Sequence, residues 1–77
     1  MIHELDSVVL ATDLPEHGLC EGDIGTVVLV HRGEEGFEVE FVALDGETVA
    51  VVSLPASQVR PIGDREIAHV RKVESTW

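Results

Sequence analysis

The chain has 77 residues, of which 15 are Asp or Glu and five are Lys or Arg, so its net charge is −10 at pH 7. This length allows one small domain, and a hydrophobic content of 44% with only Phe37, Phe41 and Trp77 as aromatic residues predicts an aliphatic core. The negative charge argues against nucleic acids and anionic membranes as partners, because both are bound through Lys and Arg.

Cys20 is the only cysteine, so no internal disulfide can form. The N-terminal residues lack the basic region and the apolar core of a signal peptide. No apolar run approaches the ~20 residues that a membrane helix needs. We therefore expect a cytoplasmic protein.

Residues 7–11, SVVLA, predict a first strand because they are rich in β-branched side chains and have polar neighbours. In this strand Val8 and Leu10 would face the core and Val9 would face outward. Residues 12–25 then form a long loop. Apolar residues spaced along this loop predict that it folds back on the core, and they are Leu14, Leu19 and Ile24.

The stretch 21–31, EGDIGTVVLVH, is the central element of the expected fold, with which most other strands should pair. Gly22 and Gly25 suit a tight turn that feeds directly into a buried strand, because glycine reaches positive φ without a Cβ clash. The second strand is predicted at 26–31. Its four consecutive apolar residues fit either burial on both faces or a bulge that turns two neighbours the same way.

Two hairpins follow. The polar turn 32–36 contains two glycines, and Asp45-Gly46 is a strong hairpin signal before a fourth strand at 48–54. Between them, 37–42 alternates between core-facing apolar and solvent-facing acidic residues, which predicts a half-buried strand. The apolar positions are Phe37, Val39 and Phe41, and the acidic ones are Glu38 and Glu40.

The fourth strand, 48–54, is expected to present two faces. Ala50, Val52 and Leu54 would face the core, leaving Val49 and Val51 outside. Residues 55–58 predict a single 3₁₀ turn, and 59–62 a short closing strand in which Pro61 suits a sheet edge.

These elements predict an all-β protein, a small five-stranded barrel over 1–62 with a C-terminal extension at 63–77. The spacing of apolar residues in the extension fits a helix, and an alternative alternation fits a strand. We expect 66–73 to be ordered as an added strand that packs on its own barrel or on a neighbouring subunit. Arg71 should face carboxylates.

Several motifs carry a resemblance. Leu54-Pro55-Ala56-Ser57-Gln58-Val59 resembles the 3₁₀ segment before the last strand of SH3-like barrels. Gly22-Asp23-Ile24-Gly25-Thr26-Val27 resembles the junction between the first loop and the second strand in SH3-like accessory chains, such as the small photosystem I stromal subunit. The same residues resemble the Gly-x-x-Gly-x-Val core of KOW modules.

More closely, residues 5–62 resemble an uncharacterised family of short bacterial and archaeal proteins, domain of unknown function 4926. The matched motifs include Asp6-Ser7-Val8-Val9-Leu10, Asp13-Leu14-Pro15-Glu16-His17-Gly18-Leu19 and Ser57-Gln58-Val59-Arg60. The resemblance implies an SH3-like fold and no assigned activity.

Two groups could carry chemistry, and we interpret neither as a site. His17 and Cys20 are three residues apart, but a structural zinc site draws on four ligands, and the nearest further candidates are His3 and His31. The loop carboxylates Glu16, Glu21 and Asp23 would need a pocket that shifts one pKa before they could act in acid–base catalysis. We expect no enzymatic activity, no metal and no cofactor.

The outward-facing valines are the more promising feature. An apolar patch on adjacent strands usually marks an interface. The predicted partner-binding residues are Val9, Val28, Leu29, Val49, Val51 and Glu38, with Asp13, Glu16 and Glu21 extending an acidic rim.

This patch predicts a non-enzymatic protein–protein interaction module. Its partner would be another copy of the chain, a larger protein of which it is a small accessory subunit, or a basic protein that its acidic surface neutralises. The alternative is a KOW-like nucleic-acid-binding module, which the charge opposes.

Overall fold

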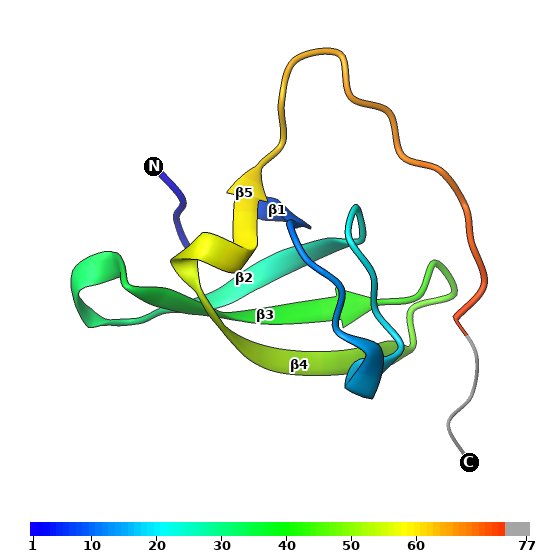
Figure 1. Ribbon diagram of the computed structural model, residues 1–77, viewed down its shortest axis with the longest axis horizontal. Coiled ribbons are helices and arrows are strands. Elements are labelled where there is room, and N and C mark those ends of the chain that lie inside the picture. Colours follow the sequence, from blue (N-terminus) through cyan, green and yellow to red (C-terminus); the bar gives the residue numbers. More distant parts are fainter. Residues whose placement is uncertain (74–77) are drawn as a thin grey trace.

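The computed structural model describes residues 1–73 and is all-β, as predicted (Figure 1). The strands are β1 (Ser7–Leu10), β2 (Ile24–Val30), β3 (Gly36–Val42), β4 (Thr48–Pro55) and β5 (Val59–Pro61). Three single 3₁₀ turns connect them, namely η1 (Pro15–His17), η2 (Arg32–Glu34) and η3 (Ala56–Gln58). None of the described residues forms a helix with the length and apolar character of a membrane span.

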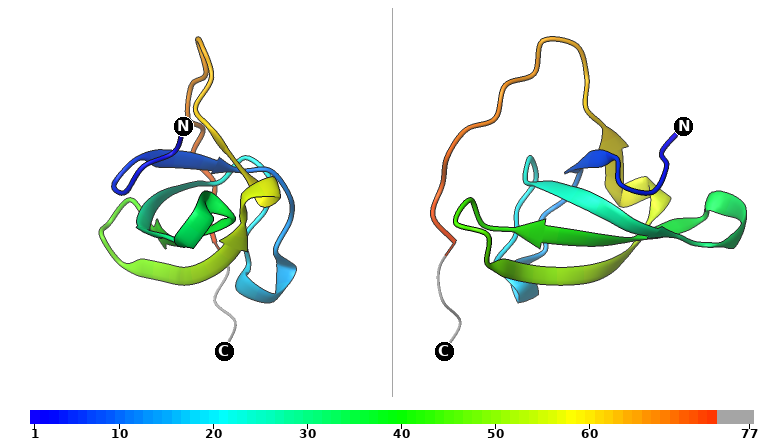
Figure 2. Two further views of the ribbon diagram at one scale, coloured as in Figure 1. Left: turned by 90° about the vertical axis from the view of Figure 1, so that its left-hand side faces the viewer. Right: turned by 180° about the vertical axis from the view of Figure 1, so that it is seen from behind.

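All five strands lie in one antiparallel sheet with the order β4-β3-β2-β1-β5. Both hairpins and the 3₁₀ turn η3 form where the sequence predicts them. The sheet curls, so that η3 carries the chain from one edge strand to the other (Figure 2). Closure of the predicted barrel is not seen, because β4 and β5 are not hydrogen-bonded neighbours.

The core is mainly aliphatic and centres on the three middle strands. Leu10, Val8, Val27 and Val39 are its largest completely buried side chains. The alternation predicted for β3 is confirmed, with its three apolar residues buried and its two glutamates partly exposed. Within residues 1–73 no polar or charged residue is buried.

The loop between β1 and β2 closes over this core only in part. Leu14 and Leu19 are buried and form an isolated β-bridge, as the loop prediction requires. Ile24, however, is 42% exposed. It is already part of β2 and pairs with Val9, so its side chain lies on the face of the sheet away from the core.

Two bulges decide which face several valines occupy. The β2–β3 register skips Val28, and both Val28 and Leu29 therefore lie outside, which confirms the bulged alternative for this strand. The β3–β4 register skips Val49. Because Val49 is the extra residue of this bulge, its side chain packs against the core and does not lie outside with Val51.

The two glycines of the stretch 21–31 have different roles. Gly22 has a φ of +97° and lies in the turn before β2. Gly25, in contrast, is inside β2 opposite Val8, so its prediction as a turn residue is wrong. A Cβ there would lie 2.5 Å from Val39 Cγ1 and 2.9 Å from Phe41 Cε1, so the missing side chain makes room for two core residues.

The described part of the extension, 63–73, contains no strand, and the predicted strand at 66–73 is therefore not formed. This segment, which we call the strap, arches away from β5 and returns beside the β3–β4 hairpin (Figures 1 and 2). Its described residues make no backbone hydrogen bonds to either sheet edge, so they do not extend the sheet. Trp77 lies outside the described residues.

We expect Gly25→Ala to destabilise the fold by about 2 kcal/mol, because the added methyl group overpacks the contact with Val39 and Phe41. Urea unfolding followed by circular dichroism measures this change. Gly63→Ala is the matched control, since its Cβ meets only the flexible side chain of Glu66. Equal midpoints for the two variants would contradict the role assigned to Gly25.

Candidate interaction surface

Two rows of side chains cross the outer face of β4, β3 and β2. The register aligns Val51 with Glu40 and Thr26 in one row, and Ser53 with Glu38 and Leu29 in the next. Directly opposed residues on neighbouring strands share a face of the sheet. We call the surface formed by these two rows and Val28 the acidic–apolar face.

The apolar members of this face are well exposed. Val51, Leu29 and Val28 are 56%, 49% and 41% exposed. They do not form the contiguous patch that the sequence predicted, because Glu38 and Glu40 of β3 stand between Val51 and the two residues of β2. Glu40 was missing from the predicted site, although its alternation with Glu38 was the signal that could have identified it.

Two of the predicted partner-binding residues do not belong to the acidic–apolar face. Val9 faces outward from β1, but it is only 6% exposed because it lies between Ile24 and Arg60 on the neighbouring strands. Val49 packs on the core at the β4 bulge. Their prediction as exposed patch residues is wrong, and Val28, Leu29, Val51 and Glu38 remain.

Hydrogen bonds hold both carboxylates of the face in place. His31 Nε2 lies 2.5 Å from Glu38 Oε2 and 3.5 Å from Ser53 Oγ. Hydrogen bonds from Ser53 and His31 lower the pKa of Glu38, which is therefore ionised at neutral pH. The Thr48 hydroxyl donates to Glu40 Oε2 over 2.7 Å.

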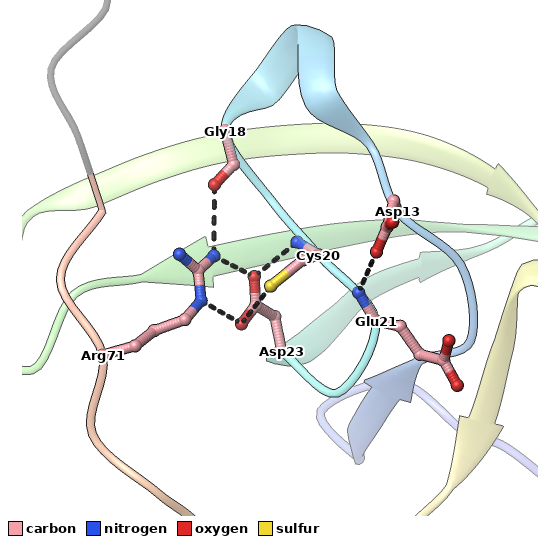
Figure 3. A network of polar contacts seen from close by, with 6 residues as sticks. All are labelled: Asp13, Gly18, Cys20, Glu21, Asp23 and Arg71. Carbon is pink, nitrogen blue, oxygen red and sulfur yellow. Dashed lines mark hydrogen bonds and ion pairs between the residues drawn. The ribbon is translucent and has the colours of Figure 1, made fainter.

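The loop carboxylates expected to extend the acidic rim lie between β1 and β2, outside the two rows of the acidic–apolar face, and they are Asp13, Glu16 and Glu21. Asp13 accepts a hydrogen bond of 2.9 Å from the backbone N–H of Glu21, which ties the two ends of the β1–β2 loop together (Figure 3). Asp23 accepts another of 2.9 Å from the N–H of Cys20. Asp13 and Asp23 thus shape the loop.

One end of the strap is anchored on this loop through Arg71 (Figure 3). Its Nε donates to Asp23 Oδ1 over 2.8 Å, its Nη2 bonds Asp23 Oδ2, and the same nitrogen donates to the Gly18 carbonyl over 3.1 Å. Partial burial works to raise the pKa of Asp23, but the hydrogen bonds from Arg71 and Cys20 together outweigh it and lower the pKa. The prediction that Arg71 faces a carboxylate is confirmed.

A second ion pair fixes the start of the strap. Arg60 of β5 donates from both terminal nitrogens to the two carboxylate oxygens of Glu66, each over 2.7 Å. The N–H of Gly63 donates to the same carboxylate over 2.5 Å. These contacts, with the one from Arg60 first, lower the pKa of Glu66 to about 2.

Between the strap and the end of the sheet lies an open cleft of about 1420 Å³. Apolar side chains line much of it, including Ile24 and Val42 of the sheet and Ile67 and Val70 of the strap. Ile67 and Val70 are 94% and 73% exposed, so they do not pack on the sheet. The strap is therefore attached mainly by its ion pairs.

The pair considered for metal binding lies in the β1–β2 loop. Cys20 is half-buried, with its Sγ 3.9 Å from Asp23 Oδ1, while His17 ends the 3₁₀ turn η1. Across residues 1–73, no three His, Cys, Asp or Glu side chains are grouped so that they could hold a metal ion.

Comparison with known proteins gives one match. The model of the family described as "Domain of unknown function (DUF4926)" matches residues 4–61, which include all five strands. No curated protein and no solved structure matches the chain.

We expect Arg71→Ala to release the far end of the strap, because it removes both the ion pair with Asp23 and the bond to Gly18. NMR relaxation should show backbone order parameters of residues 69–73 falling below about 0.6 while the strands stay near 0.85. Lys72→Ala is the neighbouring control and should leave these values unchanged. The same loss of order in both variants would rule out a specific anchor at Arg71.

We expect the carboxyl carbon of Glu66 to titrate with a midpoint near 2 in the intact protein, because Arg60 stabilises its charged form. Since this pKa is lowered on folding, the ion pair contributes stability above the ordinary pKa of 4.5, and this contribution is lost as the pH falls toward 2. NMR titration measures the midpoint. Arg60→Ala should move it toward 4.5, and Arg32→Ala should not.

Proposed function

The chain belongs to the family DUF4926, a domain of unknown function, and we propose that it acts as a non-enzymatic protein–protein interaction module that binds through the acidic–apolar face. The observation that carries this proposal is the exposure of Val28, Leu29 and Val51 on both sides of two aligned carboxylates. Exposed aliphatic side chains in a structured sheet favour contact with another protein surface.

The chemistry of the face selects the kind of partner. A surface that presents Lys or Arg between aliphatic side chains would pair its cations with Glu38 and Glu40 and cover Val51 and Leu29. A second copy of the chain would bring the same carboxylates face to face, and like charges in close contact cost free energy. We therefore favour a basic partner over a homo-oligomer.

The internal charge pairs of the chain support the same choice. Arg60 and Arg71 are engaged by Glu66 and Asp23 and not by the carboxylates of the acidic–apolar face. Among residues 1–73, the hydrogen-bond partners of these carboxylates are one histidine and two hydroxyl groups. With a net charge of −10, the chain would attract a basic partner at long range as well.

We expect a bait of this chain to capture a basic protein from a lysate of the source organism, with binding that weakens as salt is raised. The double variant Glu38→Lys and Glu40→Lys should lose this protein, because it reverses the charge of both rows. Affinity capture followed by mass spectrometry measures the difference.

The matched control is Glu16→Lys with Glu35→Lys, which changes the net charge equally at positions on η1 and at the β2–β3 turn. It should capture the partner as the parent chain does. If both double variants lose the partner, only the overall charge matters and the face is not the site. Capture of nucleic acid in place of protein would contradict the proposal and favour the KOW-like alternative.

A further inference from the structure

The two edges of the sheet are protected very differently. β5 is three residues long, contains Pro61, and has Arg60 engaged by the strap. Short length, proline and charge all hinder pairing with another strand. β4 is eight residues long and has no charged residue, and its only proline is the last residue. β4 is thus an unprotected edge strand.

The free side of β4 is unpaired along its length. Its ladder is with β3 alone, and within residues 1–73 no backbone hydrogen bond joins residues 48–54 to any other element. Every second residue of such an edge directs its N–H and C=O groups away from the sheet. Only Leu54 of this strand is buried, so these groups are accessible along most of the edge.

The side chains of β4 show what an added strand would cover. Ala50 and Val52 border the core and are only partly buried, because no strand lies beyond them. An aliphatic side chain next to them would extend the core. On the opposite face, Val51 and Ser53 are exposed, and the next strand inward carries Glu40 and Glu38.

The charge of the outer face determines which side chains an added strand would need there. Its outward positions would lie two strand spacings, about 10 Å, from the glutamates of β3. Lys and Arg are long enough to bridge this distance, with their aliphatic stems lying across Val51. We propose that β4 binds its partner by strand addition, and that the partner segment is an extended strand in which aliphatic residues alternate with Lys or Arg.

This inference rests on the proposed function and specifies how the partner is bound. A second copy of β4 is a poorer occupant, because TVAVVSLP contains no basic residue to meet Glu38 and Glu40. Two chains of net charge −10 also repel one another. A strand of alternating cationic and aliphatic residues would pair with the free backbone groups of β4. Its aliphatic side chains would cover the border of the core, and its cations would meet Glu38 and Glu40.

The test uses a synthetic peptide of the length of β4 with alternating Lys and Val, added to the full chain. We expect the alternate amide protons of residues 48–54 whose N–H groups point outward to exchange with solvent at least about tenfold more slowly in the complex. A block isomer with all lysines at one end should bind at least about tenfold more weakly, because it cannot place cations on one face only. Glu38→Gln with Glu40→Gln should weaken the alternating peptide, and Glu16→Gln with Glu35→Gln should not.

A third peptide, N-methylated at the positions whose N–H groups would face β4, separates strand addition from simple charge attraction. We expect it to lose at least about tenfold in affinity, because the backbone donors are gone while all charges remain. Equal affinity of the methylated peptide or of the block isomer would overturn strand addition. So would slowed exchange at β4 that grows with the concentration of the chain alone, since a second copy would then be the occupant.

The captured protein distinguishes this inference from the proposed function. If it perturbs the acidic–apolar face but leaves the exchange of the β4 amides unchanged, strand addition is wrong and the interaction function stands. If it slows the alternate β4 amides as the alternating peptide does, both stand.

Discussion

The structure depends on one small aliphatic core, in which all the completely buried large side chains are valine or leucine. Such a core has no polar group to orient and little volume to spare, so strand faces are selected only by which side chains it can accept. The space above Gly25 illustrates this constraint, since Val39 and Phe41 occupy the place where a side chain would lie. Every ionisable group of residues 1–73 is consequently left outside the core, where it can serve solubility or recognition.

Outside the core, the charges separate into two groups. The ion pairs Arg60–Glu66 and Arg71–Asp23 join the strap to β5 and to the β1–β2 loop. Within the described part of the chain, the carboxylates of β3 form no ion pair with arginine or lysine, and they lie among exposed aliphatic side chains. The Arg60–Glu66 pair is exposed and the Arg71–Asp23 pair is only partly buried, so both contribute modestly to stability and the strap is a weakly held segment. Carboxylates without an arginine or lysine partner in a fixed array, by contrast, can select a basic partner.

The acidic–apolar face and the free edge of β4 lie next to each other on the same strand. Val51 belongs to the face, and its neighbours Ala50 and Val52 border the core at the edge. A partner strand placed there would contact side chains of the acidic–apolar face and the unpaired backbone groups along the edge of β4. Backbone pairing would supply the affinity, while the carboxylates would select the charge. The strap and its cleft lie at one end of the sheet and leave Val28, Leu29 and Val51 uncovered.

The sequence by itself determined the all-β class, the five strands, both hairpins, the 3₁₀ turn before β5 and the alternation of β3, because these are local patterns of period two and of turn residues. The tertiary structure alone decided that Val49 packs inward, that Val9 is covered, and that Gly25 makes room for core side chains. The tertiary structure also shows a bulge at Val28, where the sequence allowed either a bulge or burial of the strand on both faces. A bulge shifts the register between two strands, and this shift decides which face a residue occupies. The register depends on both strands, so the sequence of one strand alone does not determine it. The same holds for the extension, where alternation predicted a strand but residues 63–73 make no backbone hydrogen bonds to a sheet edge. The position of Arg71 depends on Asp23, 48 residues earlier, and only folding brings the two together.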